Sequence, residues 1–172
     1  QKEVENIEKK MAIGRAAAQY VQDGDVIAVD TGTTMFEFIK AIAANKNIKV
    51  VTNDLQIAMY LERFSEIDTI LVGGKVRRNF HCTVGPIAVE AIKGFNVDRS
   101  FMAANGVHLT RGITTPHIEQ AQVKEALVAA GDEVILLADS SKLGKASFVK
   151  FAELSQVDVL ITDSGISPEL LA

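Results

Sequence analysis

The chain has 172 residues, of which 48% are hydrophobic and 23% are charged, and its formal net charge is −4. This length and composition suit one soluble globular domain with a sizeable core, and they exclude a disordered chain. No apolar run approaches the roughly 20 residues that a membrane-spanning helix needs, and the acidic balance argues against nucleic-acid binding by this segment itself.

The chain opens with an amphipathic pattern. Apolar or small residues recur at steps of three and four from Val4 to Val21, which predicts a helix over residues 3–22. Asp23-Gly24-Asp25 then marks a turn. Val26–Val29 is a continuous apolar run between turn signals, and such a run is typical of a buried strand.

Helices and strands alternate along the rest of the chain. Strands that alternate with helices predict the α/β class, with a mostly parallel sheet flanked by helices. The apolar patterns predict helices over 33–44, 54–64, 86–93 and 118–130, and strands over 48–52, 67–72, 97–103, 133–138 and 157–162.

Five polar or glycine-containing segments each follow a predicted strand directly. Ligands of open α/β sheets bind beyond the carboxyl ends of the strands, and in a parallel sheet these ends meet at one edge. The sequence therefore predicts one shared ligand site there. The segments are Asp30–Thr34, Thr52-Asn53, Gly73-Gly74, Ala104–Gly106 and Asp139–Lys142.

The first of these segments has the character of an anion site. Gly32 permits close approach of the backbone, and Thr33 and Thr34 place hydroxyl groups at a helix N-terminus, where a phosphate is favoured. In the alternative interpretation, Thr33 is an ordinary N-cap that serves only its own helix. The segment is not a Walker loop, because it lacks the Gly-Lys-Ser/Thr ending.

The next two segments also allow two interpretations. Thr52 and Asn53 offer donors and acceptors to a ligand, whereas Asn53 or Asp54 also suits the cap of the following helix. Gly73 and Gly74 form either a bare turn or a place where the backbone approaches a ligand.

Two lysines are candidate anion ligands. Lys142 follows a buried strand and can reach a phosphate or sugar oxygen, with Asp139 orienting it or accepting a sugar hydroxyl, unless the loop is simply solvated. Lys124 lies off the apolar face of its predicted helix, so it faces either the site or water, and the pattern alone favours water. Arg77 and Arg78 are expected at a solvated surface.

No catalytic or metal-binding arrangement is evident. His81, His108 and His117 lack metal-ligand spacing, so neither a metal nor a cofactor is predicted. Cys82 is the single cysteine, and we expect a buried, inert thiol. A lone cysteine cannot form an internal disulfide, which favours a reducing compartment such as the cytoplasm.

In order and spacing, these segments resemble the C-terminal effector-binding domain of DeoR-family bacterial transcriptional repressors. The resemblance extends from about Met11 to Leu171 and depends on the ordered set. The matching segments are Asp30–Thr34, Val50–Asn53, Leu71–Gly74, Gly85-Pro86, Asp98 with Phe101, Ala104–Val107, Gly112–Thr115, Glu119 with Lys124, Leu137–Lys142 and Ile161–Asp163.

This resemblance implies a fold similar to ribose-5-phosphate isomerase and the CoA-transferases. It implies a phosphorylated sugar, or a related phosphorylated metabolite, as inducer, and a homo-oligomer, either a dimer or a tetramer. It also implies that DNA is contacted only by a preceding helix-turn-helix domain. Residues 1–24 would then be a linker helix continuing from that domain, and residues 25–172 would be the sensor domain.

Carried onto this chain, the family pattern implies that Gly32, Thr33 and Thr34 cradle the phosphate. Because a carboxylate repels a phosphate, Asp30 is assigned to sugar hydroxyls or to a pair with Lys142. Thr52, Asn53 and the two glycines would line the pocket, and Asn105 with Gly106 would contact the sugar. The candidate ligand-binding residues are Asp30, Gly32, Thr33, Thr34, Thr52, Asn53, Gly73, Gly74, Asn105, Gly106, Lys124, Asp139 and Lys142.

The alternative function is that of a sugar-phosphate isomerase. Such an enzyme needs a carboxylate base beside the substrate carbon, and isomerases of this fold carry segments similar to Asp-Gly-Ala-Asp-Glu and Lys-Gly-Gly-Gly. The comparable regions here read Asp98–Phe101 and Ala104–Val107. A sensor needs only different affinities in two conformations, so the sequence favours a sensor with no catalytic residues.

Overall fold

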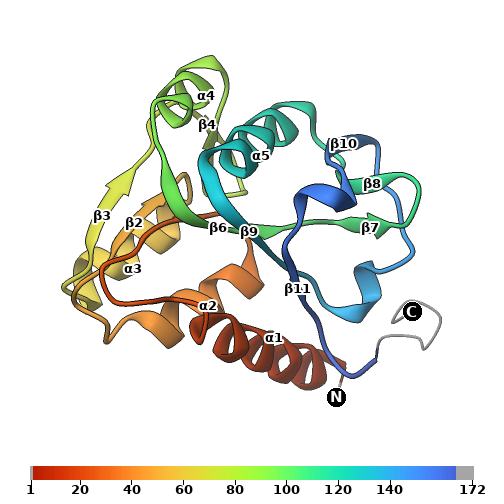
Figure 1. Cartoon of the computed structure of the whole chain (residues 1–172), viewed down its shortest axis with the longest axis horizontal. Helices are drawn as coiled ribbons and strands as arrows, with labels where there is room; N and C mark the ends of the chain where they lie inside the picture. Colours follow the sequence, from red (N-terminus) through yellow and green to blue (C-terminus); the bar gives the residue numbers. More distant parts are fainter. Residues whose placement is uncertain (1, 166–172) are drawn as a thin grey trace.

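A parallel six-stranded sheet lies at the centre of the chain (Figure 1). The structure, a computed structural model, describes residues 2–165. All neighbouring strands of this sheet run parallel, in the order β11-β9-β6-β1-β2-β3. The predicted mostly parallel α/β architecture is therefore confirmed. The strands are β1 (Val26–Val29), β2 (Lys49–Thr52), β3 (Asp68–Leu71), β6 (Val97–Ala103), β9 (Gly131–Leu137) and β11 (Val159–Ile161).

Helices cover both faces of the sheet and create two separate cores (Figure 1). On one face, Phe38 of α2 stacks on Phe101 of β6 with ring centroids 4.3 Å apart. Side chains alternate along β1, so that Ile27 and Val29 join this core while Ala28 joins the other. The helices are α1 (Lys2–Ala18), α2 (Thr33–Ile42) and α3 (Leu55–Phe64) on this face, and α4 (Pro86–Lys93) and α5 (Ile118–Ala130) on the opposite face.

Two small antiparallel sheets sit beside the main sheet, and they were not predicted. Their strands have only three or four residues, which is too short to show a clear alternation of apolar and polar side chains. They are β4 (Lys75–Arg77) with β5 (Cys82–Val84), and β10 (Val149–Ala152) with β8 (Gly112–Thr115) and β7 (Gly106–His108). Two single-turn helices, η1 (Ser140–Lys142) and η2 (Leu154–Gln156), complete the described elements.

The first helix is anchored by its second half. It ends at Ala18, four residues before the predicted end, and a turn follows. Val4 and Ile7 are exposed, whereas Ile13 is buried. Gly14 lies directly against the backbone of α2, because a Cβ atom there would be 2.8 Å from backbone atoms of residues 37 and 38. Among residues 2–165, no helix is both long and apolar enough to cross a membrane.

Candidate ligand site

A cavity of about 990 Å³ opens at the carboxyl ends of the central strands. It lies at the sheet edge where the sequence predicts a shared site. Its wall includes the segment after β1, the segment after β6, η1, the first turns of α5 and the turn between β4 and β5. The parallel topology therefore brings distant parts of the chain to one place.

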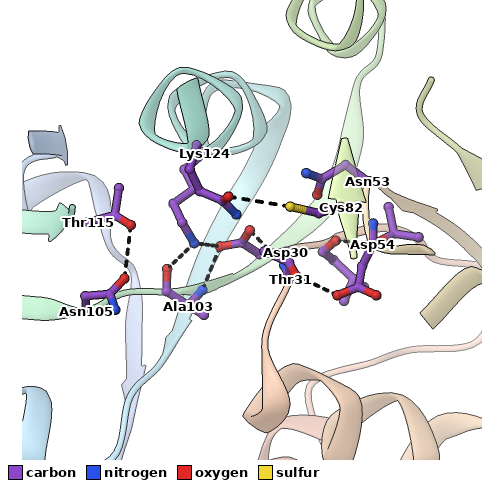
Figure 2. A network of polar contacts seen from close by, with 12 residues as sticks. Asp30, Thr31, Asn53, Asp54, Cys82, Ala103, Asn105, Thr115 and Lys124 are labelled. Atoms are coloured by element: carbon purple, nitrogen blue, oxygen red, sulfur yellow. Dashed lines mark hydrogen bonds and ion pairs between the residues drawn. The ribbon is translucent and has the colours of Figure 1, made fainter. Parts of the chain in front are cut away.

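The centre of this edge is a buried ion pair (Figure 2). Asp30 is fully buried, and its Oδ2 accepts hydrogen bonds from Lys124 Nζ at 2.5 Å and from the Ala103 N–H at 3.0 Å. Its Oδ1 accepts from the Thr31 N–H at 2.8 Å. The expected pairing of Asp30 with Lys142 is therefore wrong, since Lys124 supplies the cation. Asp30 also lies behind the cavity wall, so its carboxylate is not placed to accept sugar hydroxyls.

The helical pattern favoured a solvent-facing position for Lys124. In the structure this residue lines the cavity instead, and only 4% of its surface is exposed. Helix α5 is covered on several sides, because its buried residues include Gln120, Val123 and Leu127. A position off the apolar stripe is therefore still an interior position. The ammonium group also donates to the Ala103 carbonyl oxygen at 3.0 Å. Two of its three N–H groups are thus used within the protein, and the third remains for a ligand.

The N-terminus of α2 faces the cavity without a side-chain cap. Gly32 occupies the N-cap position with φ of 130°, a backbone conformation that L side chains rarely adopt. The interpretation of Thr33 as an ordinary N-cap is wrong, because no side chain caps this helix. The N–H groups of the first turn lack partners within the helix. Gly32, Thr33 and Thr34 all line the cavity, so this end of the cavity favours an anion.

Other helices that begin at the cavity are capped. Asp54 accepts from the Ile57 N–H at 2.9 Å and so caps α3, which confirms one of the two expected caps. The other Asp54 oxygen accepts from the Thr31 hydroxyl at 2.6 Å (Figure 2). Asp139 caps η1 by accepting from the Ser141 N–H. These carboxylates neutralise their own helix ends, in contrast to the open end of α2.

Two further predicted ligand residues lie on the cavity wall. Lys142, at the end of η1, lines the cavity together with Asp139. Asn105, which follows β6, also lines it. The Asn105 Oδ1 accepts from the Thr115 hydroxyl at 3.0 Å (Figure 2). That bond holds the side-chain amide in one orientation and leaves its N–H groups for a ligand.

Thr52 and Asn53 do not line the cavity, contrary to the expectation. Thr52 Oγ1 donates to the Val29 carbonyl oxygen at 2.8 Å, and Asn53 Nδ2 donates to the Thr83 carbonyl oxygen at 2.8 Å. Both residues are fully buried. These bonds tie β2 to β1 and to the β4–β5 hairpin, so both side chains serve the fold.

The predicted glycines after β3 and β6 also lie outside the cavity wall. A Cβ atom on Gly74 would be 2.9 Å from the Val84 carbonyl oxygen, whereas a Cβ atom on the neighbouring Gly73 would meet nothing within 4 Å. A Cβ atom on Gly106 would be 2.6 Å from both the Lys145 carbonyl oxygen and Thr114 Oγ1. Gly74 and Gly106 therefore allow close approach of the protein's own backbone and side chains, whereas Gly73 has open space around it.

Several cavity-wall residues at the β4–β5 hairpin were not predicted from the sequence. Arg77 was expected in solvent with Arg78, but it lines the cavity, and its Nη1 donates to Gln120 Oε1 at 3.0 Å. Its guanidinium carbon also lies 3.6 Å from the centre of the Phe80 ring. Such contacts leave no signal in a short sequence window, because Arg77 and Gln120 are 43 positions apart.

Cys82 is buried, as expected, beneath this part of the wall. Its Sγ donates to Gln120 Oε1 at 3.5 Å. Burial raises the pKa of the thiol above its ordinary value of 9.0, so the reactive thiolate is disfavoured at neutral pH. In the part of the chain that the structure describes, no group of three His, Cys, Asp or Glu side chains is close enough to hold a metal ion.

Comparison with known proteins identifies the family. Residues 5–164 match the family described as the DeoR C terminal sensor domain. The chain belongs to the DeoR family. This DeoR sensor domain is 37% identical over 98% of its length to the HTH-type transcriptional regulator GlpR of Haloferax volcanii. It is 36% identical over 91% of its length to the HTH-type transcriptional repressor GlcR of Bacillus subtilis. It spans 66% and 60% of these two relatives.

The fold of this DeoR sensor domain recurs in an enzyme. Ribose 5-phosphate isomerase A of Methanocaldococcus jannaschii superposes with a TM-score of 0.57 at 20% sequence identity, over 81% of this chain and 54% of that chain. The expected likeness to the isomerase fold is therefore confirmed. At this identity the comparison concerns the fold alone, because one fold supports many functions.

Proposed function

We propose that this DeoR sensor domain binds a phosphorylated sugar, or a related phosphorylated metabolite, with its phosphate at the N-terminus of α2. The observation that carries the proposal is the uncapped first turn of this helix, which begins at Gly32 and lines the cavity. Backbone N–H groups there supply donors and the positive end of the helix dipole. Thr33 and Thr34 add hydroxyl groups, and Lys142 adds a positive charge on the same wall.

The sugar portion would lie toward Asn105 and Lys124. Both residues are held by protein contacts and keep N–H groups free for sugar oxygens. The residues outside the cavity wall, such as Thr52 and Gly74, then support the site without contacting the ligand.

The same geometry favours binding over conversion. Asp30 lies behind Lys124, and both oxygens of Asp54 accept hydrogen bonds from the protein. Asp139 is engaged in the cap of η1. An isomerase requires a carboxylate free to remove a proton from a substrate carbon, whereas both oxygens of Asp30 and both oxygens of Asp54 are committed to structural contacts.

In the complete regulator, we expect the ligand to act on DNA binding. The relatives GlpR and GlcR are named as HTH-type regulators, and this chain spans about two thirds of their length. A preceding helix-turn-helix domain would contact the operator, and residues 1–24 would connect it to the sensor. Because linkage is reciprocal, an inducer that weakens operator binding is itself bound more weakly by the operator complex. The assembly would be a homodimer or homotetramer.

The decisive experiment is a panel of pentose and hexose phosphates, with the unphosphorylated sugars as controls. Both the melting temperature and product formation are followed for each compound. A phosphate-dependent rise in melting temperature without turnover supports the proposal, and at about 100 times Kd the stabilisation is expected to reach about 2.7 kcal/mol. Turnover at enzyme-like rates would overturn the sensor assignment, and equal stabilisation by the unphosphorylated sugars would overturn the phosphate site.

A further inference from the structure

The wall of the cavity holds a second polar group, distant from α2. Gln120, in the first turn of α5, lines the cavity and is only 4% exposed. Its Oε1 accepts from both Arg77 Nη1 and Cys82 Sγ. Among the residues that the structure describes, its Nε2 has no hydrogen-bond acceptor. Gln120 can therefore still donate hydrogen bonds to a ligand through Nε2.

Arg77 adds further donors at the same position. Its guanidinium group is held between Gln120 Oε1 and the face of the Phe80 ring. A guanidinium group has five N–H donors and no acceptor, so the contact with Gln120 leaves most of its capacity available. Held in this way, Arg77 loses little further side-chain entropy when it binds a ligand.

A subsite composed of donors selects the chemistry of its ligand. A ligand hydroxyl group that accepts a hydrogen bond also carries a proton that needs an acceptor of its own, whereas a carboxylate or phosphate oxygen only accepts. Hydrogen bonds to an anion are also stronger than those to a neutral group. The Asp54 carboxylate lies on the same wall, but its two oxygens accept from the Ile57 N–H and the Thr31 hydroxyl. The donors of Gln120 and Arg77 therefore remain available to an anionic group.

This group of donors comes from a different part of the cavity wall than the N-terminus of α2, because Gln120 belongs to α5 and Arg77 to β4. Helices α2 and α5 cover opposite faces of the sheet (Figure 1). Lys124, one turn after Gln120 on α5, binds Asp30, which comes directly before the segment that leads into α2. A cavity of about 990 Å³ is at the upper end of the range that holds drug-sized ligands. It has room for a ligand with two charged ends.

We propose that Gln120 and Arg77 form a second anion subsite, and that the effector carries a second phosphate or a carboxylate in addition to its first phosphate. The inference builds on the proposed function, which places the first phosphate at α2. It goes further by assigning a doubly anionic ligand and the residues that select it.

The test is a crystal structure of the domain grown with selenate, a phosphate-sized anion that anomalous scattering locates. Two anion peaks are expected, one at the backbone of Thr33 and Thr34 and one within hydrogen-bond distance of Gln120 Nε2 and Arg77. Parallel crystals with acetate distinguish the two chemistries, because a subsite that takes acetate but not selenate selects a carboxylate.

Variants with matched controls decide which residues bind. Gln120→Glu keeps the side-chain shape but brings a negative charge to the subsite, and Arg77→Ala removes the guanidinium. Each is expected to abolish the second peak and keep the first. Gln122→Glu, at an exposed position of the same helix, and Arg78→Ala, at an exposed position next to Arg77, are expected to keep both. Circular dichroism confirms that each variant folds.

The outcomes separate this inference from the proposed function. A peak at α2 alone, in selenate and in acetate, overturns the second subsite and leaves the proposed function standing. A peak at Gln120 alone supports the second subsite and overturns the phosphate site at α2. A second peak that persists in Gln120→Glu and Arg77→Ala also overturns the assignment, and the absence of both peaks overturns both proposals.

Discussion

Lys124 donates to the Asp30 carboxylate at 2.5 Å across 94 positions of sequence, and both side chains are buried. We predict that Lys124→Met lowers the free energy of unfolding by about 3–5 kcal/mol, because it leaves a buried carboxylate without its cation. The double variant Asp30→Asn/Lys124→Met is expected to recover part of that loss, since it removes the unpaired charge. Urea unfolding at neutral pH measures both effects.

An exposed ion pair provides the control for the variants of the buried pair. Lys93 and Glu90 form an exposed ion pair on α4, so Lys93→Met is expected to change the free energy of unfolding by less than about 1 kcal/mol. If Lys124→Met were as mild as Lys93→Met, the buried pair would not hold α5 against β1.

The phosphate site is tested by removing its side-chain donors. Thr33→Ala/Lys142→Ala is expected to lower the affinity for the phosphorylated ligand by at least about tenfold, because a hydrogen bond to a charged group contributes about 1.5–3 kcal/mol. Both residues lie on the cavity wall and outside the core, so the variant should fold. Isothermal titration calorimetry gives the affinity. Lys145→Ala, at an exposed position outside the wall, is the matched control, and unchanged affinity in the double variant would contradict the site.

The predictions from sequence succeeded for the parts of the fold that local patterns encode. A buried parallel strand can appear as a continuous apolar run, so β1 was predicted with the bounds that the structure has. The bounds of β6 were also predicted correctly, although this strand contains polar residues in its first half. Helix α5 was also predicted correctly from residue 118 to residue 130. The five short antiparallel strands were missed, because each depends on a partner strand and carries little pattern of its own.

The candidate site was predicted by position, but its contacts were not. Strand ends located the segment 31–34, Asn105 and Lys142 on the cavity wall. The partner of Asp30 depends on how α5 packs over β6 and β1, which no sequence window contains. The position of Gly74 and Gly106 outside the cavity wall could not be predicted, because a glycine permits close approach without indicating what approaches it. For Gly74, the neighbour is the hairpin strand β5.

Gly74 and Gly73 therefore offer a direct comparison. Gly74 has φ of 148°, and a Cβ atom there would be 2.9 Å from the Val84 carbonyl oxygen, whereas a Cβ atom on Gly73 meets nothing within 4 Å. Gly74→Ala is expected to cost about 1–3 kcal/mol of stability through backbone strain and steric overlap, while Gly73→Ala stays within about 1 kcal/mol. Chemical denaturation measures both. Equal effects of the two substitutions would contradict the close packing of the hairpin.

We predict that burial of the Cys82 thiol makes the stability of the domain depend on pH in the alkaline range. Burial raises the pKa of Cys82 in the folded state above 9.0, so the folded state favours the neutral thiol. This contribution to stability is fully present below pH 9.0 and is lost as the pH rises through the folded pKa. Between about pH 8 and about pH 10.5, the wild type should therefore lose more stability than Cys82→Ala. An equal loss in both proteins would show that the thiol is not buried in solution.

Direct backbone contact between α1 and α2 at Gly14 has a mechanical consequence. Because no side chain separates the two helices there, no change of rotamer can absorb a displacement of one against the other. The first turn of α2 forms part of the cavity wall, so we expect a ligand that shifts this helix to shift α1 with it. We therefore expect the direction of the exposed first turns of α1, which carry Val4 and Ile7, to change when a ligand occupies the cavity.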